Sequence, residues 1–383
     1  MDGPRHAGAG TKRRHGHVRI GVPREIKPGE GRIALLPPQV ARLTARGRTV
    51  IVERQAGLAS GADDDDYRAA GAEVVADGGA VYAGAELIAK VKEILPAEFD
   101  LLRPEHVLLT NIHAAGDPLQ LDRLLEVGLI AIAAEDTHQH GTTNSPIAGE
   151  IGALEGLRLT MAPHGGGGRH FMAHFGAPAT RALVIGLGGA GRGVLRTLLG
   201  LGCSVVGLDV DPRARREAEL TWHDADLTID DIGTLADHLP EADAVFNCVL
   251  WDKTRGDHLL SRPMLATMKP AAVIVDISCD AGGAIETSRP TTWDDPVYQV
   301  DGIRHFCVDN IPGAAPVCAS AGYAGLLLPW IEAVAELGAL AACRRHPWLA
   351  RGLTCAQGTL THAEAARVQG RDFVPVDDFL AGA

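Results

Sequence analysis

The chain has 383 residues, of which 46% are hydrophobic and 22% charged, and its formal net charge at pH 7 is −12. This length and composition are typical of a globular protein with two domains. The negative charge argues against nucleic acid or an anionic membrane surface as a partner.

The first part of the chain alternates between predicted strands and helices. Residues 1–17 are polar and basic, and we expect them to form a disordered extension. Beyond them, five short apolar runs have the length of strands, at 18–22, 49–54, 86–91, 106–112 and 129–135. Helical patterns lie between some of these runs, at 38–47 and 117–127. This alternation predicts parallel βαβ units.

Four consecutive aspartates occupy residues 63–66. Carboxylates are favourable at the positive end of a helix dipole, so this run predicts the start of a solvated helix. A metal site is the alternative, but the run lacks the ligand spacing and the glycine of an EF-hand. We therefore expect no metal site.

A second series of strands follows a polar break at 136–147. Residues 148–160 have a helical pattern, and 164–170 form a glycine-rich loop. Further apolar runs predict strands at 182–186, 204–209, 244–250, 272–278 and 305–309, followed by a helix at 320–338. We predict that residues 147–317 form one domain and that 18–146 plus 318–383 form a discontinuous second one, with a cleft between them.

The segment from Ala182 to Asp209 contains the most informative motif. An apolar run leads into Gly186-Leu-Gly188-Gly-Ala-Gly191, a helical pattern follows, and a second apolar run ends at Asp209. The three glycines permit a tight turn, a close approach to a pyrophosphate and close packing of helix on strand. The helix N-terminus favours the phosphate, and Asp209 is placed to bind the ribose hydroxyls and repel a 2′-phosphate. We therefore predict NAD as cofactor and an α/β fold with two Rossmann-like, doubly wound parallel-sheet domains.

Charged residues follow three strands of the discontinuous domain. Arg32 comes soon after the first strand, Lys92 closes the strand at 86–91 and His113 closes the strand at 106–112. Because the ends of parallel strands share one edge, we expect these residues to meet there. Two cations suit a carboxylate, Arg32 by bidentate pairing, and a histidine suits acid–base chemistry near neutral pH. Each residue alone is better explained by an ordinary structural role, and only the shared edge brings a joint functional role level with it.

Polar residues also end two strands of the nucleotide-binding domain. Asp276 and Asp280 follow the apolar run at 272–278, and glycines after Asp280 favour its projection into the cleft. Asn310 ends the last strand, where it could contact the carboxamide of a nicotinamide.

The cysteines and the termini set expectations about the compartment. The seven cysteines form no Cys-x-x-Cys pair, which is typical of reduced thiols in a cytoplasmic protein. Cys203, Cys248 and Cys279 fall on or beside strands and are expected to be core residues. No apolar run approaches the roughly 18 residues of a spanning helix, and the basic N-terminus does not look like a secretory signal. We expect a cytoplasmic protein without a membrane segment.

Almost the whole chain beyond residue 18 resembles one known family, that of alanine dehydrogenase and the transhydrogenase α-subunit. The matching stretches are Arg19 to Leu35, Lys90 to Glu93, the segment around His113, Asp276 to Thr292, His305 to Gly313 and Arg351 to Leu353. The resemblance implies a role for each predicted site residue, and it implies a homo-oligomer, commonly a hexamer.

By position, Arg32 and Lys92 match the family's carboxylate-binding cations, and His113 and Asp280 match its catalytic histidine and aspartate. Asp209 matches the family's ribose ligand, and Asn310 matches its residue near the nicotinamide. The implied partners are a small amino acid and its 2-oxo acid.

Three stretches depart from the family pattern. Pro146-Ile-Ala148 replaces the usual Pro-Met-Ser, residues 250–258 replace Leu-x-Pro-Gly-Ala-Lys-Ala-Pro, and the stretch after Pro316 lacks Arg-Thr-Ser-Thr. Within 250–258, we expect Lys253 or Arg255 to pair with a carboxylate on a larger substrate. The alternative is a solvated loop over an ordinary alanine site.

The lead prediction is an NAD-dependent, alanine dehydrogenase-like enzyme that interconverts an amino acid and a small 2-oxo acid with ammonia. The first alternative is an opine-type reductase, in which an amino-acid amine replaces ammonia, because the divergent branch resembles carboxyethyl-ornithine synthase-like proteins. The second alternative is a non-catalytic NAD-binding subunit. It ranks last because it predicts loss of the acid–base pair, whereas His113 and Asp280 are both present.

Overall fold

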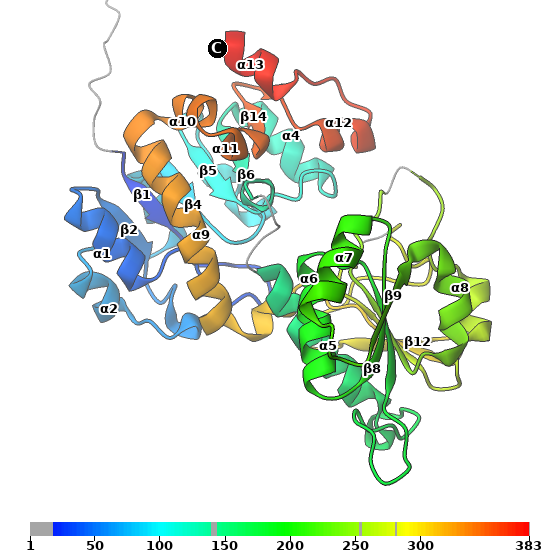
Figure 1. Cartoon of the computed structure of the whole chain (residues 1–383). Helices are drawn as coiled ribbons and strands as arrows, with labels where there is room; N and C mark the ends of the chain where they lie inside the picture. The colour runs from blue at the N-terminus through cyan, green and yellow to red at the C-terminus, as the bar shows by residue number, and fades with distance from the viewer. Residues whose placement is uncertain (1–17, 139–143, 253–254, 280–281, 383) are drawn as a thin grey trace, which may run out of the picture.

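The computed structural model describes residues 18–138, 144–252, 255–279 and 282–382. The predicted extension at 1–17 and two residues of the predicted site region, Lys253 and Asp280, lie outside these ranges. Figure 1 shows two α/β lobes side by side, with helices α5 (Asn144–Thr160) and α9 (Pro316–Leu337) near their junction.

The first lobe contains an eight-stranded sheet in the order β15-β14-β6-β5-β4-β1-β2-β3. Strands β1 to β6 pair in parallel, whereas β14 runs antiparallel to β6. The strands are β1 Ile20–Val22, β2 Val50–Glu53, β3 Glu73–Val75, β4 Leu87–Ala89, β5 Val107–Thr110, β6 Ile130–Ala133, β14 Leu353–Ala356 and β15 Thr359–Leu360. The carboxyl ends of β1, β4 and β5 therefore lie next to one another.

Helices cover both faces of this sheet. On one face Leu43 of α1 and Leu327 of α9 join a core with Ile20, and on the other Val81 of α3 and Leu121 of α4 join a second core. The bounds are α1 Pro37–Ala45, α2 Asp64–Ala69, α3 Gly78–Gly84, α4 Pro118–Val127, α10 Ala339–Arg345, α11 Pro347–Arg351, α12 Ala363–Gln369 and α13 Val376–Gly382. Helix α2 confirms the helix start predicted from the aspartate run, because the Asp63 side chain caps it.

The second lobe contains a seven-stranded sheet in the order β12-β13-β11-β10-β7-β8-β9, in which only β12 is antiparallel to its neighbour. The strands are β7 Arg181–Ile185, β8 Ser204–Asp209, β9 Leu227–Asp231, β10 Ala244–Asn247, β11 Val273–Asp276, β12 Val297–Val300 and β13 Ile303–Phe306. The helices are α5, α6 Gly189–Gly200, α7 Pro212–Thr221 and α8 Leu235–His238. Helices α5 and α6 approach so closely that a Cβ on Gly149 would lie 2.0 Å from the Ala190 carbonyl oxygen.

Helix α9 corrects one expectation from the sequence. Its 22 residues include a window with a mean hydropathy of 1.4, so by length and composition it could cross a membrane. Pro329 and Glu332 interrupt its apolar run, so the sequence predicts a helix at 320–338 but no spanning segment. Within this protein α9 is a core helix, since Tyr323, Leu327 and Ile331 are fully buried against the first sheet.

The predicted strands of both series are present, but five strands of the sheets were not predicted. These are the edge strands β3 and β9, the antiparallel β12 and the returning pair β14 and β15. The last predicted strand, 305–309, begins earlier and ends at Phe306, so Asn310 lies in the loop after β13 rather than at its end. The two separate sheets support the predicted domain division, whose boundaries stay a prediction.

Candidate active site

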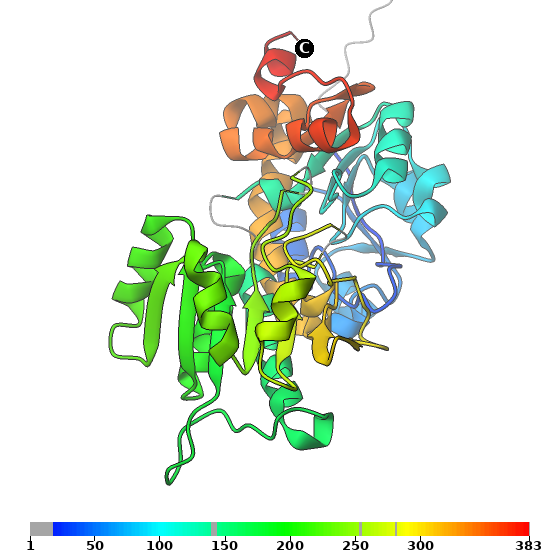
Figure 2. The ribbon, with the colours of Figure 1, turned by 90° about the vertical axis from the view of Figure 1, so that its right-hand side faces the viewer.

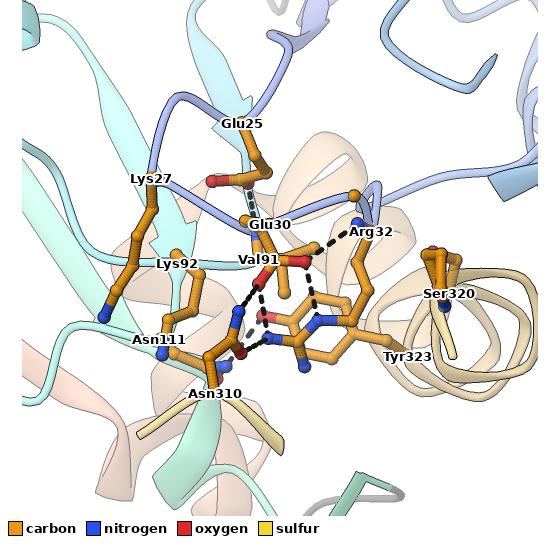
Figure 3. Close-up of polar contacts among 12 residues, drawn as sticks. Glu25, Lys27, Glu30, Arg32, Val91, Lys92, Asn111, Asn310, Ser320 and Tyr323 are labelled. Atoms are coloured by element: carbon orange, nitrogen blue, oxygen red, sulfur yellow. Dashed lines mark hydrogen bonds and ion pairs between the residues drawn. The ribbon is translucent and has the colours of Figure 1, made fainter. Parts of the chain in front are cut away.

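Arg32 lies at the centre of a buried polar network that joins the two lobes (Figure 3). Its side chain is 4% exposed, and Glu30 accepts hydrogen bonds from its Nε at 2.9 Å and its Nη2 at 2.6 Å. Asn310 of the second lobe accepts from Nη2 at 2.7 Å and donates to Glu30 at 3.0 Å. With its amide oxygen turned toward Arg32, Asn144 accepts from Nη1 at 2.8 Å. The structure therefore brings together two predicted site residues, Arg32 and Asn310.

Glu30 stays ionised in this network. Burial alone would raise the pKa of Glu30, but the hydrogen bonds and charge of Arg32 bring it below its ordinary value. The fixed carboxylate holds the guanidinium plane in one orientation, since two parallel bonds define it. Glu30 was not among the predicted site residues. Its signal in the sequence is its position two residues before Arg32 in a loop that follows a buried strand.

Lys92 lies beside this network on the loop after β4, and Figure 3 shows it between Lys27 and Arg32. Its Nζ is 3.6 Å from Glu93, which also accepts from Lys27 at 2.7 Å. Burial chiefly lowers the pKa of Lys92, and the charges of Lys27 and Arg32 lower it further against the opposing charge of Glu93. Burial would raise the pKa of Glu93, but Lys92 and Lys27 bring it to about 2. Two predicted cations, Arg32 and Lys92, are thus close enough to influence each other.

A second buried network, missed from the sequence, supports the strand that carries Lys92. Lys90 lies 2.6 Å from Glu98 and 3.4 Å from Glu25, and all three are buried. Glu25 also accepts the Val91 N–H at 2.6 Å, and Tyr323 of α9 donates to the Lys90 carbonyl at 3.1 Å. These bonds fix the backbone on either side of Val91, and therefore the position from which Lys92 extends.

His113 lies at the end of β5 in a strained turn with φ of 49°. Its backbone N–H donates to Glu135 at 2.7 Å, and its ring Nδ1 lies 3.7 Å from the same carboxylate oxygen. The side chain is 56% exposed, so one face of the ring is open. Glu135, which the sequence analysis missed, also accepts from Ile112 and orients the turn.

The dinucleotide motif has the geometry that the sequence predicts. Gly186 ends β7 with φ of 91°, and a Cβ on Gly191 would lie 1.8 Å from the Gly186 carbonyl oxygen. Gly188 is the N-cap of α6, and a Cβ added to it would meet no described atom within 4 Å. The helix N-terminus is thus open to a pyrophosphate, so these residues fit the predicted cofactor.

Asp209 ends β8 beside this cradle. Its carboxylate accepts the Leu187 N–H at 2.6 Å and the Asp211 N–H at 2.8 Å, which keeps it at the rim of the glycine turn. Arg215 donates to the Asp209 carbonyl and pairs with Asp231 at 2.7 Å. The guanidinium of Arg215 therefore already has an acidic partner.

Arg255 does not join Arg32 and Lys92. One edge of its guanidinium, Nε and Nη2, donates to the two carboxylate oxygens of Asp257 at 2.8 Å each, and the guanidinium stacks over Trp251 at 4.5 Å. Its side chain is 53% exposed. The loop nevertheless reaches the other lobe, because Asp252 lies 3.3 Å from Arg367 of α12. In Figure 2 the yellow-green segment after β10 extends toward these C-terminal helices.

A cavity of about 290 Å³ lies on the first lobe beside this site. Its lining includes Glu25, Glu30 and Arg32, and it also includes Gln55 from the loop after β2. A space of this size next to a buried arginine is sufficient for a small carboxylic acid.

The fold and the site together define a class: two-lobed α/β proteins in which a sheet with a dinucleotide-binding glycine motif lies beside a lobe with buried cations. Within this class, the chain belongs to the alanine dehydrogenase/PNT family. Residues 21–146 match the model of the family's N-terminal domain, and residues 153–363 match that of its C-terminal domain.

Individual relatives agree with this assignment. The chain is 35% identical to an alanine dehydrogenase of Bacillus subtilis, over 94% of this chain and 97% of the relative. It is 34% identical to an alanine dehydrogenase of Mycobacterium tuberculosis, over 95% of this chain and 100% of the relative. Among solved structures, an L-alanine dehydrogenase superposes with a TM-score of 0.83 at 32% identity, covering 92% and 99% of the two chains. A transhydrogenase from Sinorhizobium meliloti superposes with a TM-score of 0.74 at 25% identity, covering 89% and 99%.

Proposed function

We propose that this protein is an NAD-dependent amino-acid dehydrogenase of the alanine dehydrogenase type, which converts a small 2-oxo acid and ammonia into an amino acid and catalyses the reverse reaction. The observation that carries the proposal is the junction of Arg32 and Lys92 with Asn310. Two cations of the first lobe stand beside a residue of the lobe that carries the dinucleotide motif.

Arg32 and Lys92 hold the substrate carboxylate in this proposal. A carboxylate that reaches Nη1 of Arg32 replaces the neutral amide of Asn144, and the nearby Lys92 ammonium adds a second positive charge. Glu30 keeps the guanidinium in its plane. Positioning of this kind can lower a reaction barrier by on the order of 7–11 kcal/mol when the reacting atoms are well aligned.

NAD, held by Gly186, Gly188, Gly191 and Asp209, supplies the hydride acceptor when bound. His113 exchanges protons with the substrate nitrogen or with water, and Glu135 stabilises the protonated imidazole. Asp280 is the second proton-handling group by family resemblance. Asn310 positions the nicotinamide carboxamide next to the Arg32 site.

An opine-type reductase is the second candidate, because the loop after β10 departs from the alanine dehydrogenase pattern. Trp251 and Arg255 stand on an exposed loop, and Asp252 pairs with Arg367 across the lobes. A second amino acid at this loop could exchange its carboxylate for that of Asp257 on Arg255. In this candidate the amine of that amino acid replaces ammonia.

We further propose that the protein is a cytoplasmic homo-oligomer. The hexamer is implied only by the family. Cytoplasmic localisation is supported by the absence of any disulfide, since all seven cysteines lie in the described residues and are free.

The experiment that tests the function is a screen of NADH oxidation with a panel of 2-oxo acids, first with ammonium and then with amino acids as nitrogen donors. We expect turnover with a small 2-oxo acid and ammonium, and NADH to be used in preference to NADPH. Turnover only with an amino acid as donor would establish the opine-type reaction instead. No oxidation with any pair would contradict both.

A further inference from the structure

Two thiols and a carboxylate lie together where the strands of the second sheet end. Strands β11 and β13 pair in parallel, with Val275 opposite Phe306, so the next residues, Asp276 and Cys307, come side by side. The chain beyond β11 places Cys279 against the same point. One carboxylate oxygen and the two sulfur atoms all lie within 4.8 Å of one another, and all three residues are buried.

We propose that Asp276, Cys279 and Cys307 form a binding site for a thiophilic divalent cation, for which Zn²⁺ is the best fit. Zinc binds sulfur at about 2.3 Å and carboxylate oxygen at about 2.0–2.2 Å, which places tetrahedral ligand atoms roughly 3.5–3.8 Å apart. The three atoms need to close by only about 1 Å to reach this geometry. Mg²⁺ and Ca²⁺ do not fit, because they prefer oxygen ligands alone. Three protein ligands leave a fourth position for water.

The residues around the cluster have the arrangement of outer-shell partners at a metal site. Asn247 donates to Asp276 at 2.8 Å, which fixes the orientation of the carboxylate. The hydroxyls of Tyr298 and Ser288 lie 3.5 Å and 3.7 Å from the Cys307 sulfur. Such contacts orient the ligands and adjust their basicity.

Charge favours a cation at this point. A carboxylate oxygen and two sulfur atoms are buried within 4.8 Å of one another, and zinc binds cysteine as the thiolate, so a divalent cation neutralises the negative charge gathered there. Binding therefore displaces protons from the thiols.

The sequence does not reveal this site because its first and last ligands, Asp276 and Cys307, are 31 positions apart. We expected no metal and assigned Cys279 to the core. The proposal does not depend on the proposed function, since metal binding is measured without turnover.

The test uses the full-length reduced protein after removal of metals with a chelator. Zn²⁺ binding is measured by equilibrium dialysis and elemental analysis, and Cd²⁺ serves as a second probe because its bonds to thiolates absorb in the ultraviolet. We expect one ion per chain, Cd–thiolate absorption, and release of protons on binding. Cys279→Ser and Cys307→Ser should each weaken binding about 100-fold or more, by analogy with the effect of disturbing metal ligands.

Two cysteines provide matched controls. Cys248 follows the neighbouring strand β10 close to Asp276, and Cys318 is exposed on α9. Cys248→Ser and Cys318→Ser should bind the ion as the wild type does. If a cluster variant unfolds without metal, as judged by its thermal unfolding midpoint, Asp276→Asn takes its place and should also weaken binding.

Three results would overturn the proposal. The first is the absence of stoichiometric Zn²⁺ or Cd²⁺ binding to the reduced wild type. The second is binding that survives in folded Cys279→Ser and Cys307→Ser, and the third is binding lost equally in Cys318→Ser.

Discussion

The two walls of the candidate site are built differently. On the first lobe, Arg32 and Lys92 are each less than a tenth exposed and have carboxylate neighbours in fixed positions. On the second lobe, the loop after β10 carries its charge at the surface, with Arg255 53% exposed and paired only two residues away. In the function that we propose, the buried wall recognises the carboxylate, which all substrates share, whereas the exposed loop is free to change with the substrate.

The largest effect is expected from the buried wall. Arg32→Met removes the charge that binds the substrate carboxylate and leaves Glu30 buried without its partner. Truncating one partner of a buried, hydrogen-bonded charge pair in a binding site costs about 2–5 kcal/mol, so we expect kcat/KM to fall by about 30-fold to several thousand-fold. Steady-state kinetics measure this loss, and the dissociation constant of NADH serves as the control because it should change little. A variant with nearly normal kcat/KM would remove Arg32 from substrate binding.

Proton transfer should give the next largest effect. We expect His113→Ala and Asp280→Ala each to lower kcat by about 10²-fold or more, the contribution usual for an acid–base group. Glu135→Gln should have a smaller effect, because Glu135 touches His113 but not the substrate. The amide oxygen that Glu135→Gln introduces can still accept the backbone N–H groups of Ile112 and His113, so the turn keeps its shape in this variant. A loss of kcat as large as that of His113→Ala would contradict this supporting role for Glu135.

The pH dependence of substrate binding should reveal Lys92. Its pKa lies below that of an ordinary lysine, chiefly because the side chain is buried. As the pH rises, the Lys92 ammonium therefore loses its proton before an ordinary lysine does, and KM for the amino acid should rise about tenfold as the pH passes this lowered pKa. Lys92→Arg keeps its charge over this range, so its KM should stay level. A rise in KM of equal size in both proteins would assign the titration to another group.

The exposed wall should give the smallest effect. If the loop contacts the substrate, Arg255→Ala should raise KM for the preferred substrate a few-fold, on the order of 1 kcal/mol for an exposed charge pair. L-alanine would then be a poor substrate of the wild type. Asp257→Asn is the matched variant, since it frees Arg255 from its partner and should lower KM. Wild-type behaviour of both variants, with efficient oxidation of L-alanine, would show that the loop plays no part in substrate choice.

The sequence contained enough information for the main architecture. The glycine motif and the alternation of apolar runs identified both sheets because parallel strands buried on both faces are continuous hydrophobic segments. The edge strands β3 and β9 were missed since their residues are mostly half-exposed and lack such a run. Helix α12 and the antiparallel strand β14 were not predicted because both are short.

The sequence predicted the two cations of the site, Arg32 and Lys92. It did not predict the carboxylates that fix their positions. The apolar runs in the sequence locate the strands, and Arg32 and Lys92 follow strands whose ends share an edge of the sheet. Their carboxylate partners, Glu30 and Glu93, lie within two residues of them. The buried network that supports the strand of Lys92 instead pairs Glu25 with Lys90, which are 65 positions apart. Such pairs depend on the tertiary fold, and a glutamate in a loop has the same local appearance whether it is solvated or buried.

The most direct test of the proposed dehydrogenase activity is to follow a deuterium label. NADH carrying deuterium at both C4 positions of the nicotinamide is incubated with the best 2-oxo acid of the screen and ammonium, and the products are examined by mass spectrometry. We expect an amino acid with a single deuterium on Cα from the wild type, and almost no labelled amino acid from Arg32→Met. Deuterium in a 2-hydroxy acid, or label that never leaves the nucleotide, would contradict the proposal that this protein is an amino-acid dehydrogenase.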